Sequence, residues 1–222
     1  MDHGKPIIYV KNVRKVYRMG DEEVVALKRI NLRIYKGEVC CIFGTSGSGK
    51  STLLNQLAGM EKPTKGQVFI RGKNISDMNE EELAAFRQEH MSFIFQSYNL
   101  LPSMTAVENV AMPLMFKGMD RKRREAMAEE MLKRVGLSHR LHHYPSQMSG
   151  GQQQRAGIAR AFVSRPEVVF ADEPTGNLDT KTTAEIMDMV MGFARRFNQT
   201  IILVTHDPGM SRYADRIVTL SL

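Results

Sequence analysis

The loop Gly44-Thr45-Ser46-Gly47-Ser48-Gly49-Lys50-Ser51 decides the fold, because it matches the pattern G-x-x-x-x-G-K-[ST] at every fixed position. It follows the apolar run EVCCIF and precedes STLLNQLAG, which has helical spacing. Glycines let a loop wrap so closely that its backbone N–H groups face phosphate oxygens, and the helix start adds free donors. We therefore expect a phosphate-binding loop in which Lys50 reaches the phosphates, Ser51 ligates Mg²⁺ and Thr52 contacts the bound molecule.

The composition fits one domain with a sizeable core and room for an inserted subdomain, since 42% of the 222 residues are hydrophobic. No apolar stretch approaches the roughly 18 to 20 residues that a membrane helix needs, and MDHGKPIIYV lacks the layout of a signal peptide. We therefore expect a soluble, cytoplasmic chain. Cys40 and Cys41 are neighbours on an apolar run, so they point to opposite faces of a strand and are predicted to be reduced core residues.

Hydrophobic patterning predicts two kinds of strand around the loop. Apolar and polar residues alternate near Ile30–Ile34 and Val68–Ile70, which is typical of antiparallel strands with one covered face. Other runs are apolar without a break, as expected for parallel strands buried on both faces. These runs are Val39–Phe43, Val168–Ala171 and Ile201–Val204.

A helical insertion is predicted between about residues 97 and 160. The sequence pattern changes there to an apolar segment that contains prolines, and a charged stretch with helical spacing follows over Arg121–Val135. The basic run Arg121–Arg124 is interpreted as a solvated helix face, and it lacks the aromatic interleaving of an RNA site. We predict one α/β nucleotide-binding domain over 1–222. Its P-loop NTPase core (about 1–96 and 161–222) has a mainly parallel sheet, with an N-terminal antiparallel β subdomain and an inserted α-helical subdomain.

A second candidate site is the stretch Val168-Val169-Phe170-Ala171-Asp172-Glu173, where a buried strand ends in two carboxylates. A carboxylate at such a strand end suits Mg²⁺, which favours Asp172. Glu173 then follows as the candidate general base that polarises an attacking water. Alone, the pair would be interpreted as a polar strand end entering the turn at Pro174, but the phosphate-binding loop favours catalysis.

A third candidate is Ser149-Gly150-Gly151-Gln152, which opens another helix and offers a second phosphate cradle. The alternative is a simple helix cap with Ser149 as the N-cap residue. Lys50 and Ser149 lie 99 positions apart, and two such cradles beside a single P-loop lysine are unusual for one chain.

Together these motifs resemble the ABC ATPases over essentially the whole chain. Met148-Ser149-Gly150-Gly151-Gln152 is similar to their signature motif, usually LSGGQ, and methionine for leucine conserves volume. Four further residues resemble family positions: Gln96 the Q-loop glutamine, Asp179 the D-loop aspartate, His206 the switch histidine and Tyr17 the aromatic that stacks on adenine. The stretches FQSYNLLPSMTAVENV and ADEPTGNLD resemble the ATPases of lipoprotein-release, macrolide-export, bacitracin-resistance and cell-division complexes.

The resemblance implies a head-to-tail homodimer in which each ATP lies between one chain's P-loop and the other chain's signature motif. Glu173 would activate water, Lys50 and His206 would stabilise the transferring phosphoryl group, and Gln96 would act in catalysis. Mg²⁺ would be held by Ser51, Gln96 and Asp172.

The resemblance also implies an integral membrane subunit that docks near Gln96–Met119 and holds the ATPase on the inner face of the membrane. Nine of the sixteen methionines fall between Met78 and Met148, which suits either an adaptable docking surface or core filling. Two functions stay open, namely transport or extraction by the membrane subunit, and an ATP-dependent clamp of the cell-division type that moves no substrate. DNA-repair or ribosome-associated work is disfavoured, and no nucleic acid is expected, because the chain lacks tandem cassettes, a coiled-coil insertion and a nucleic-acid module.

Overall fold

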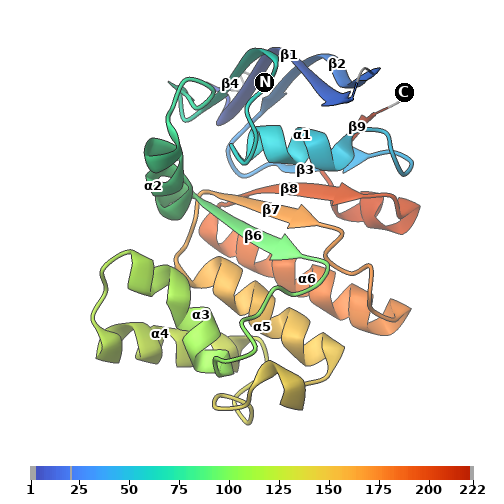
Figure 1. The fold of residues 1–222 in the computed structure, drawn as a ribbon. Helices are drawn as coiled ribbons and strands as arrows, with labels where there is room; N and C mark the ends of the chain where they lie inside the picture. The colour runs from blue at the N-terminus through green and yellow to red at the C-terminus, as the bar shows by residue number, and fades with distance from the viewer. Residues whose placement is uncertain (1–3, 21, 221–222) are drawn as a thin grey trace. The chain divides into compact units, whose positions relative to one another are not determined.

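The computed structural model describes residues 4–20 and 22–220, which form two compact units. The first unit comprises the described residues up to Arg87 and those from Thr200 onward, and the second comprises Gln88–Gln199. Figure 1 shows that each unit has its own strands and helices. The predicted helical insertion lies inside the second unit, and the assignment of the whole chain as one nucleotide-binding domain stays a prediction.

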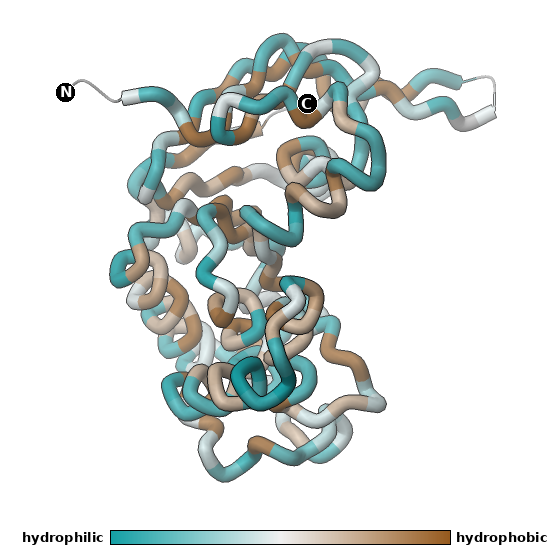
Figure 2. Tube along the Cα trace, turned by 90° about the vertical axis from the view of Figure 1, so that its left-hand side faces the viewer, coloured by the Kyte–Doolittle hydropathy of each residue, from teal (hydrophilic) through white to brown (hydrophobic). Residues whose placement is uncertain are grey.

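An antiparallel sheet of order β2-β1-β4-β5 forms part of the first unit. Leu32 and Ile34 are buried whereas Arg33 between them is exposed, and Val68 and Ile70 are also buried, so the predicted alternation is confirmed. Figure 2 shows the same alternation of hydrophobic and hydrophilic residues along the β1–β2 hairpin. The strands are β1 (Ile8–Met19), β2 (Glu22–Ile34), β4 (Lys65–Ile70) and β5 (Lys73–Asn74).

A parallel sheet completes the first unit, because β3 (Val39–Phe43) pairs with both β8 (Thr200–Thr205) and β9 (Arg216–Thr219). The register places Phe43 opposite Thr205 and Thr219, so the three strands end at one edge. The first four residues of β3 and all six of β8 are buried, which confirms the prediction from their unbroken apolar runs. The helical elements of this unit are α1 (Lys50–Leu57), most of α2 (Glu80–His90) and the 3₁₀ helix η2 (Pro208–Tyr213).

The two cysteines lie in the middle of β3, where both are fully buried and free. Burial raises the pKa of the Cys40 thiol to about 12. A thiol of that pKa stays protonated and unreactive at neutral pH, so the prediction of reduced core residues is confirmed.

In the second unit, β6 (Met91–Phe95) and β7 (Val168–Asp172) pair in parallel, with Phe95 opposite Asp172. Phe93 of β6 stacks on Phe170 of β7 at a centroid distance of 5.3 Å. Helices α3, α4 and α5 pack on one another, and α5 also contacts α6, as Figure 1 shows. The helices are α3 (Ala106–Phe116), α4 (Arg121–Arg134), α5 (Gly150–Val163) and α6 (Thr180–Phe197), with the 3₁₀ helix η1 (Pro145–Gln147) before α5.

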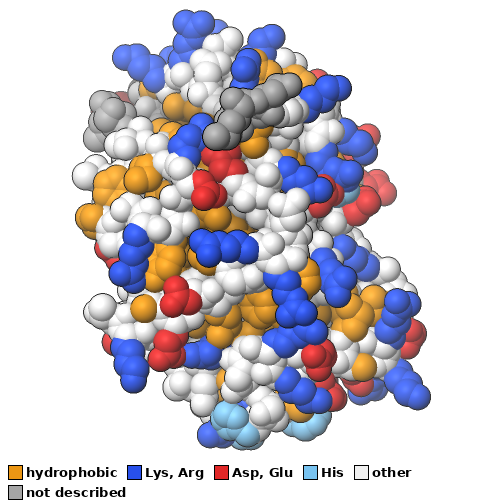
Figure 3. Space-filling view, turned by 180° about the vertical axis from the view of Figure 1, so that it is seen from behind, with side chains coloured by type: hydrophobic (Ala, Val, Ile, Leu, Met, Phe, Trp, Pro, Cys, Tyr) orange, Lys and Arg blue, Asp and Glu red, His pale blue; other side chains and the backbone are white. Residues whose placement is uncertain are grey.

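The charged helix predicted over Arg121–Val135 is present as α4, which begins after the N-cap Asp120 and has Val135 as its C-cap. Arg121, like the next two residues, is exposed, and Figure 3 shows acidic and basic side chains mixed where α4 lies. A solvated face therefore describes this helix well. Within residues 4–20 and 22–220, no helix is both long and apolar enough to cross a membrane.

Candidate nucleotide-binding and catalytic site

The phosphate-binding loop leaves β3 directly and leads into α1, whose N-cap residue is Gly49. Gly49 has a φ of 91°, a left-handed conformation that strains any residue with a Cβ. A Cβ on Gly49 would also lie 2.6 Å from the carbonyl oxygen of Ala26, and one on Gly44 would lie 2.5 Å from Ser48 Oγ. The close wrap predicted from the sequence therefore depends on glycine at both ends of the loop.

The start of α1 is suited to an anion, because its N-cap provides no side-chain hydrogen bond and its first turn contains no acidic residue. First-turn N–H groups have no partner within a helix, so they remain available together with the positive end of the helix dipole. Lys50 is only 8% exposed, and its Nζ donates to Thr45 O at 2.7 Å, so the ammonium lies within the loop. Ser48 Oγ is buried without a hydrogen-bond partner among the described residues. Ser51 is exposed and Thr52 half-buried at the same helix start.

Tyr17 lies on β1 in the same unit as the loop, and its hydroxyl donates to Glu61 Oε2 at 2.7 Å. Burial, with the hydrogen bond to Glu61, raises the pKa of Tyr17, although a hydrogen bond with Thr52 lowers it. The contact with Thr52 brings the phenol to the second residue after Lys50. Burial alone would raise the pKa of Glu61, but hydrogen bonds from Tyr17, Lys15 and Asn55 outweigh it and lower that pKa. Glu61 was not predicted from the sequence.

His206 follows the last residue of β8 and is exposed. Because Thr205 is the register partner of Phe43, His206 and the phosphate-binding loop both begin where paired parallel strands end. The structure therefore brings the predicted switch histidine to the same sheet edge as the P-loop, where α/β sheets place ligands.

Gln96, Asp172 and Glu173 meet in the second unit for the same reason. Phe95 and Asp172 are register partners, so Gln96 and Glu173 both follow the carboxyl ends of paired strands. The side chains of Asp172 and Glu173 are half-buried, and Gln96 is exposed. The amide and the two carboxylates therefore follow neighbouring strand ends at this edge, and their roles in catalysis and metal binding stay predictions.

Glu173 has a left-handed backbone, with a φ of 45° that few residues other than glycine adopt. The next residue, Pro174, is buried, and its carbonyl accepts a hydrogen bond from the fully buried amide of Gln154 in α5. Pro174 predicts a turn here, but the hydrogen bond from Gln154 was not predicted, because it joins residues 20 positions apart. Strained backbone of this kind occurs where surrounding contacts hold it and is frequent at functional sites.

The Q-loop, defined here as Gln96–Asn99, is held from two sides within the second unit. Gln96 Nε2 donates to Asn177 Oδ1 at 3.3 Å, and Asn177 Nδ2 donates to Gln96 O at 3.1 Å. Arg160 of α5 donates to the carbonyl oxygens of both Tyr98 (2.8 Å) and Asn99. The guanidinium therefore fixes the turn in which both residues have positive φ values.

The signature segment forms a helix cap as well as a possible cradle. Ser149 Oγ accepts from Gln152 N at 3.3 Å, and Gln152 Oε1 accepts from Ser149 N at 3.0 Å, a reciprocal capping box. The hydroxyl proton of Ser149 is not used in this box, and the residue is exposed, so it can still donate to an anion. Gly150 and Gly151 open α5, and a Cβ on Gly150 would lie 2.7 Å from Tyr98 Oη.

Asp179 is the N-cap residue of α6, where its carboxylate accepts from the N–H groups of Lys181 and Thr182 and from Thr182 Oγ1. The hydrogen bond from the Thr182 side chain, followed by those from the backbone, lowers the pKa of Asp179. Its local role is helix capping, and its predicted contact with nucleotide stays a prediction.

The predicted Mg²⁺ ligands are distributed over both units, with Ser51 in the first and Asp172 and Gln96 in the second. The described part of the chain contains no cluster of three or more His, Cys, Asp or Glu side chains that could hold a metal. Mg²⁺ in nucleotide sites takes few protein ligands and draws the others from phosphates and water. A hydroxyl, a carboxylate and an amide are suitable donors, and the Mg²⁺ site stays a prediction.

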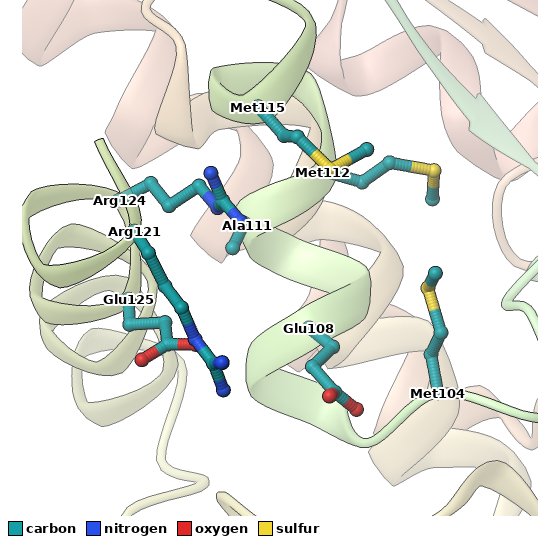
Figure 4. Close-up of a pocket in the computed structure, with 8 residues that line it drawn as sticks. All are labelled: Met104, Glu108, Ala111, Met112, Met115, Arg121, Arg124 and Glu125. Atoms are coloured by element: carbon teal, nitrogen blue, oxygen red, sulfur yellow. The ribbon is translucent and has the colours of Figure 1, made fainter. Parts of the chain in front are cut away.

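A groove lies between α3, which belongs to the segment Gln96–Met119 predicted to meet a membrane subunit, and α4, which follows that segment (Figure 4). It encloses a cavity of about 250 Å³. Arg121 pairs with Glu125 at 2.7 Å, and Arg124 donates to Met119 O at 3.1 Å. Leu101, a predicted contact, is exposed but does not line the groove. The lining residues are Met104, Glu108, Ala111, Met112, Met115, Arg121, Arg124 and Glu125.

The fold and these motifs define a P-loop ATPase. The sequence profile of the family described as ABC transporter matches residues 27–176, and the chain belongs to this family. The predicted fold class and the prediction of an ATP-hydrolysing enzyme of ABC type are thereby confirmed.

Relatives and solved structures cover nearly all of this chain. An uncharacterised ABC transporter ATP-binding protein of Methanocaldococcus jannaschii is 48% identical over 214 residues, covering 96% of this chain and 95% of that protein. The macrolide export ATP-binding/permease protein MacB of Shigella flexneri is 45% identical over 215 residues, 97% of this chain but 33% of that protein. The dimeric structure of a post-hydrolysis state of an ATP-binding cassette bound to ADP and Pi has a TM-score of 0.90 at 43% identity, covering 96% of this chain and 94% of that one.

Proposed function

We propose that this ATPase forms a homodimer when it binds ATP and that the dimer drives a separate membrane subunit, which holds it on the cytoplasmic face of the membrane. The observation that carries the proposal is the contrast between two helix starts. The start of α1 is uncapped and holds Lys50, whereas that of α5 is capped and presents the hydroxyl of Ser149. The start of α1 is suited to binding several phosphate oxygens, and the start of α5 is suited to one hydrogen bond from Ser149.

The proposed chemistry is positioning and electrostatics. Lys50 and the N–H groups of the loop bind the β- and γ-phosphates, and Glu173 accepts a proton from the attacking water. His206 and Gln96 contact the γ-phosphate and the water. Mg²⁺ bound by Ser51, Asp172 and Gln96 would neutralise phosphate charge.

In the dimer, the second chain contributes Ser149, Gly150, Gly151 and Gln152 to each site, and Asp179 lies near them. The relative of known structure supports this arrangement, since that ATP-binding cassette is a dimer in a post-hydrolysis state bound to ADP and Pi. Tyr17 supplies a ring on which adenine stacks.

Transport is the function favoured for the membrane partner, because the relative MacB is named as a macrolide export protein that combines ATP-binding and permease parts. This chain spans about a third of that protein's length. The membrane partner of this chain is proposed as a separate subunit. The groove between α3 and α4 is the proposed docking site for a short cytoplasmic helix of that subunit. A clamp of the cell-division type, which moves no substrate, is the alternative.

Light scattering tests the dimer. The Glu173→Gln variant should be a dimer with ATP and Mg²⁺ and a monomer with ADP, because hydrolysis no longer empties the closed state. Adding Ser149→Arg should return it to a monomer in ATP. A Glu173→Gln variant that stays monomeric at saturating ATP would contradict the proposal.

A further inference from the structure

The side chains around Tyr17 form a network that stacking alone does not require. The Tyr17 hydroxyl donates to Glu61 Oε2 at 2.7 Å, and Lys15 Nζ lies 3.2 Å from the same oxygen. The other carboxylate oxygen of Glu61 accepts from Asn55 Nδ2 at 3.1 Å. Because Asn55 belongs to α1, one carboxylate joins β1 to the helix that begins with Lys50.

Glu61 is itself held by the end of α1. The carbonyl oxygen of Asn55 accepts from Met60 N at 2.9 Å and from Glu61 N at 3.3 Å. Asn55 therefore holds both the backbone of the turn after α1 and, through its side chain, the carboxylate of Glu61. Lys62 adds a further tie, since its carbonyl oxygen accepts from Lys15 Nζ at 3.0 Å. The phenol is therefore tied through Glu61 to α1, the helix that begins with Lys50.

Lys15 also restricts which side of the ring a base can use. Its Nζ lies 5.1 Å from the centroid of the Tyr17 ring, within the range of a cation–π contact. Lys15 is largely buried, with 16% of its side chain exposed. With an ammonium over one face, a flat ligand would have to stack on the opposite face.

We propose that Glu61 is a positioning residue for adenine, which sets the tilt and distance of the Tyr17 ring relative to the phosphate-binding helix. This inference rests on the proposed stacking of adenine on Tyr17. Stacking on a single ring is a weak interaction that depends on ring geometry. A ring that is free to rotate must be ordered by the ligand, so loss of the tether weakens binding of the base and leaves binding of the phosphates unchanged.

The test compares a nucleotide with its phosphates alone. Glu61→Ala should weaken Mg-ADP binding by about two- to tenfold, the range expected for one lost hydrogen bond, with no change for Mg-pyrophosphate. Tyr17→Phe should have a similar effect on ADP, and the double variant should bind ADP no more weakly than the weaker single variant. Glu61→Gln, which keeps an oxygen for the hydroxyl, should recover most of the affinity.

Glu23→Ala is the matched control, because Glu23 pairs with Arg18 at 3.3 Å on the same hairpin and is exposed. It should bind ADP normally. Equal weakening of ADP and pyrophosphate by both Glu61 variants would indicate a general structural role and overturn the proposal.

Tyr17→Ala separates this inference from the stacking on which it depends. If Tyr17→Ala weakens ADP binding and neither Glu61 variant does, the role of Glu61 is overturned while stacking stands. If Tyr17→Ala leaves ADP binding unchanged, both are overturned. Thermal unfolding of each variant confirms that a folded protein is measured.

Discussion

At the scale of single residues, Glu173 shows how backbone geometry separates two adjacent carboxylates. Asp172 is still the last residue of β7, whereas Glu173 already has a left-handed φ of 45°. The chain thus departs from strand geometry between them, and the hydrogen bond from Gln154 to Pro174 O holds the turn. Asp172 therefore keeps the geometry of the strand end, and Glu173, on a different backbone conformation, can take a different role.

Glu173→Gln should lower ATP turnover by about two to four orders of magnitude, since an amide cannot accept the proton of the attacking water. ATP binding should persist, because the side chain has nearly the same shape. Phosphate release and equilibrium binding measure the two effects. Glu185→Gln is the control, as Glu185 is exposed and paired with Arg155 at 2.7 Å, and it should hydrolyse ATP normally. A near-normal rate in Glu173→Gln would remove it as the general base.

The residues that sequence reasoning located are those carried by local motifs, and those it missed act through distant partners. Glu173 was predicted because it follows an apolar strand in a chain with a phosphate-binding loop, and Gln96 was predicted from its resemblance to the Q-loop glutamine of the ABC ATPases. Glu61, Arg160 and Gln154 were not, because their hydrogen bonds reach residues 44, 62 and 20 positions away. Such pairings depend on tertiary packing, which no local spacing encodes.

At the scale of elements, some strands can be predicted from local sequence, whereas others depend on tertiary pairing. The unbroken run Val168–Ala171 predicts β7 to within a residue, because burial on both faces excludes polar side chains. The twelve-residue strand β1 was not delimited, because its register against β2 shifts at three points and its apolar periodicity is interrupted. Bulges of this kind add residues without a local sequence signature.

Arg160→Ala should destabilise the Q-loop, since the side chain donates to two carbonyl oxygens that would lose a charged partner. Burial lowers the pKa of Arg160, because the charged guanidinium loses solvation there. The two hydrogen bonds to the Q-loop carbonyls offset this desolvation cost. We expect a lower melting temperature and faster protease cleavage near Leu100. Arg160→Lys should recover little, because an ammonium does not reproduce the planar fork. If Arg160→Ala has the cleavage rate and melting temperature of the wild type, Arg160 does not hold the Q-loop in place.

Polar substitution in the α3–α4 groove should uncouple the membrane partner without unfolding the chain. Met104→Glu and Met115→Glu alter half-buried and exposed side chains that line the cavity, so basal ATPase activity and melting temperature should hold while partner-stimulated activity falls. Met131→Glu is the contrasting control, because Met131 is buried and the charge should destabilise the fold. If the two groove variants lose stability as Met131→Glu does, those methionines serve the core.

At the scale of the whole molecule, the two helix starts proposed to bind phosphate belong to different units of the chain. Lys50 lies in the first unit and Ser149 in the second. Both starts suit the same triphosphate, and the proposed homodimer lets each be used once per site. This predicts that lesions in the two motifs complement each other when they are carried by different chains.

Lys50→Ala and Ser149→Arg homodimers should each be nearly inactive, because every composite site then contains one lesion. In a mixed dimer both lesions fall in one site, and the other site joins the intact P-loop of the Ser149→Arg chain to the intact signature of the Lys50→Ala chain. Mixing the two should therefore restore part of the ATPase activity, whereas a chain that carries both substitutions should restore none when added to either variant. Nucleotide-dependent association of the mixture, followed by light scattering, gives a second readout that does not require one site to fire alone. A mixture that neither associates with ATP nor hydrolyses it above the two separate variants would argue that each chain completes its site by itself.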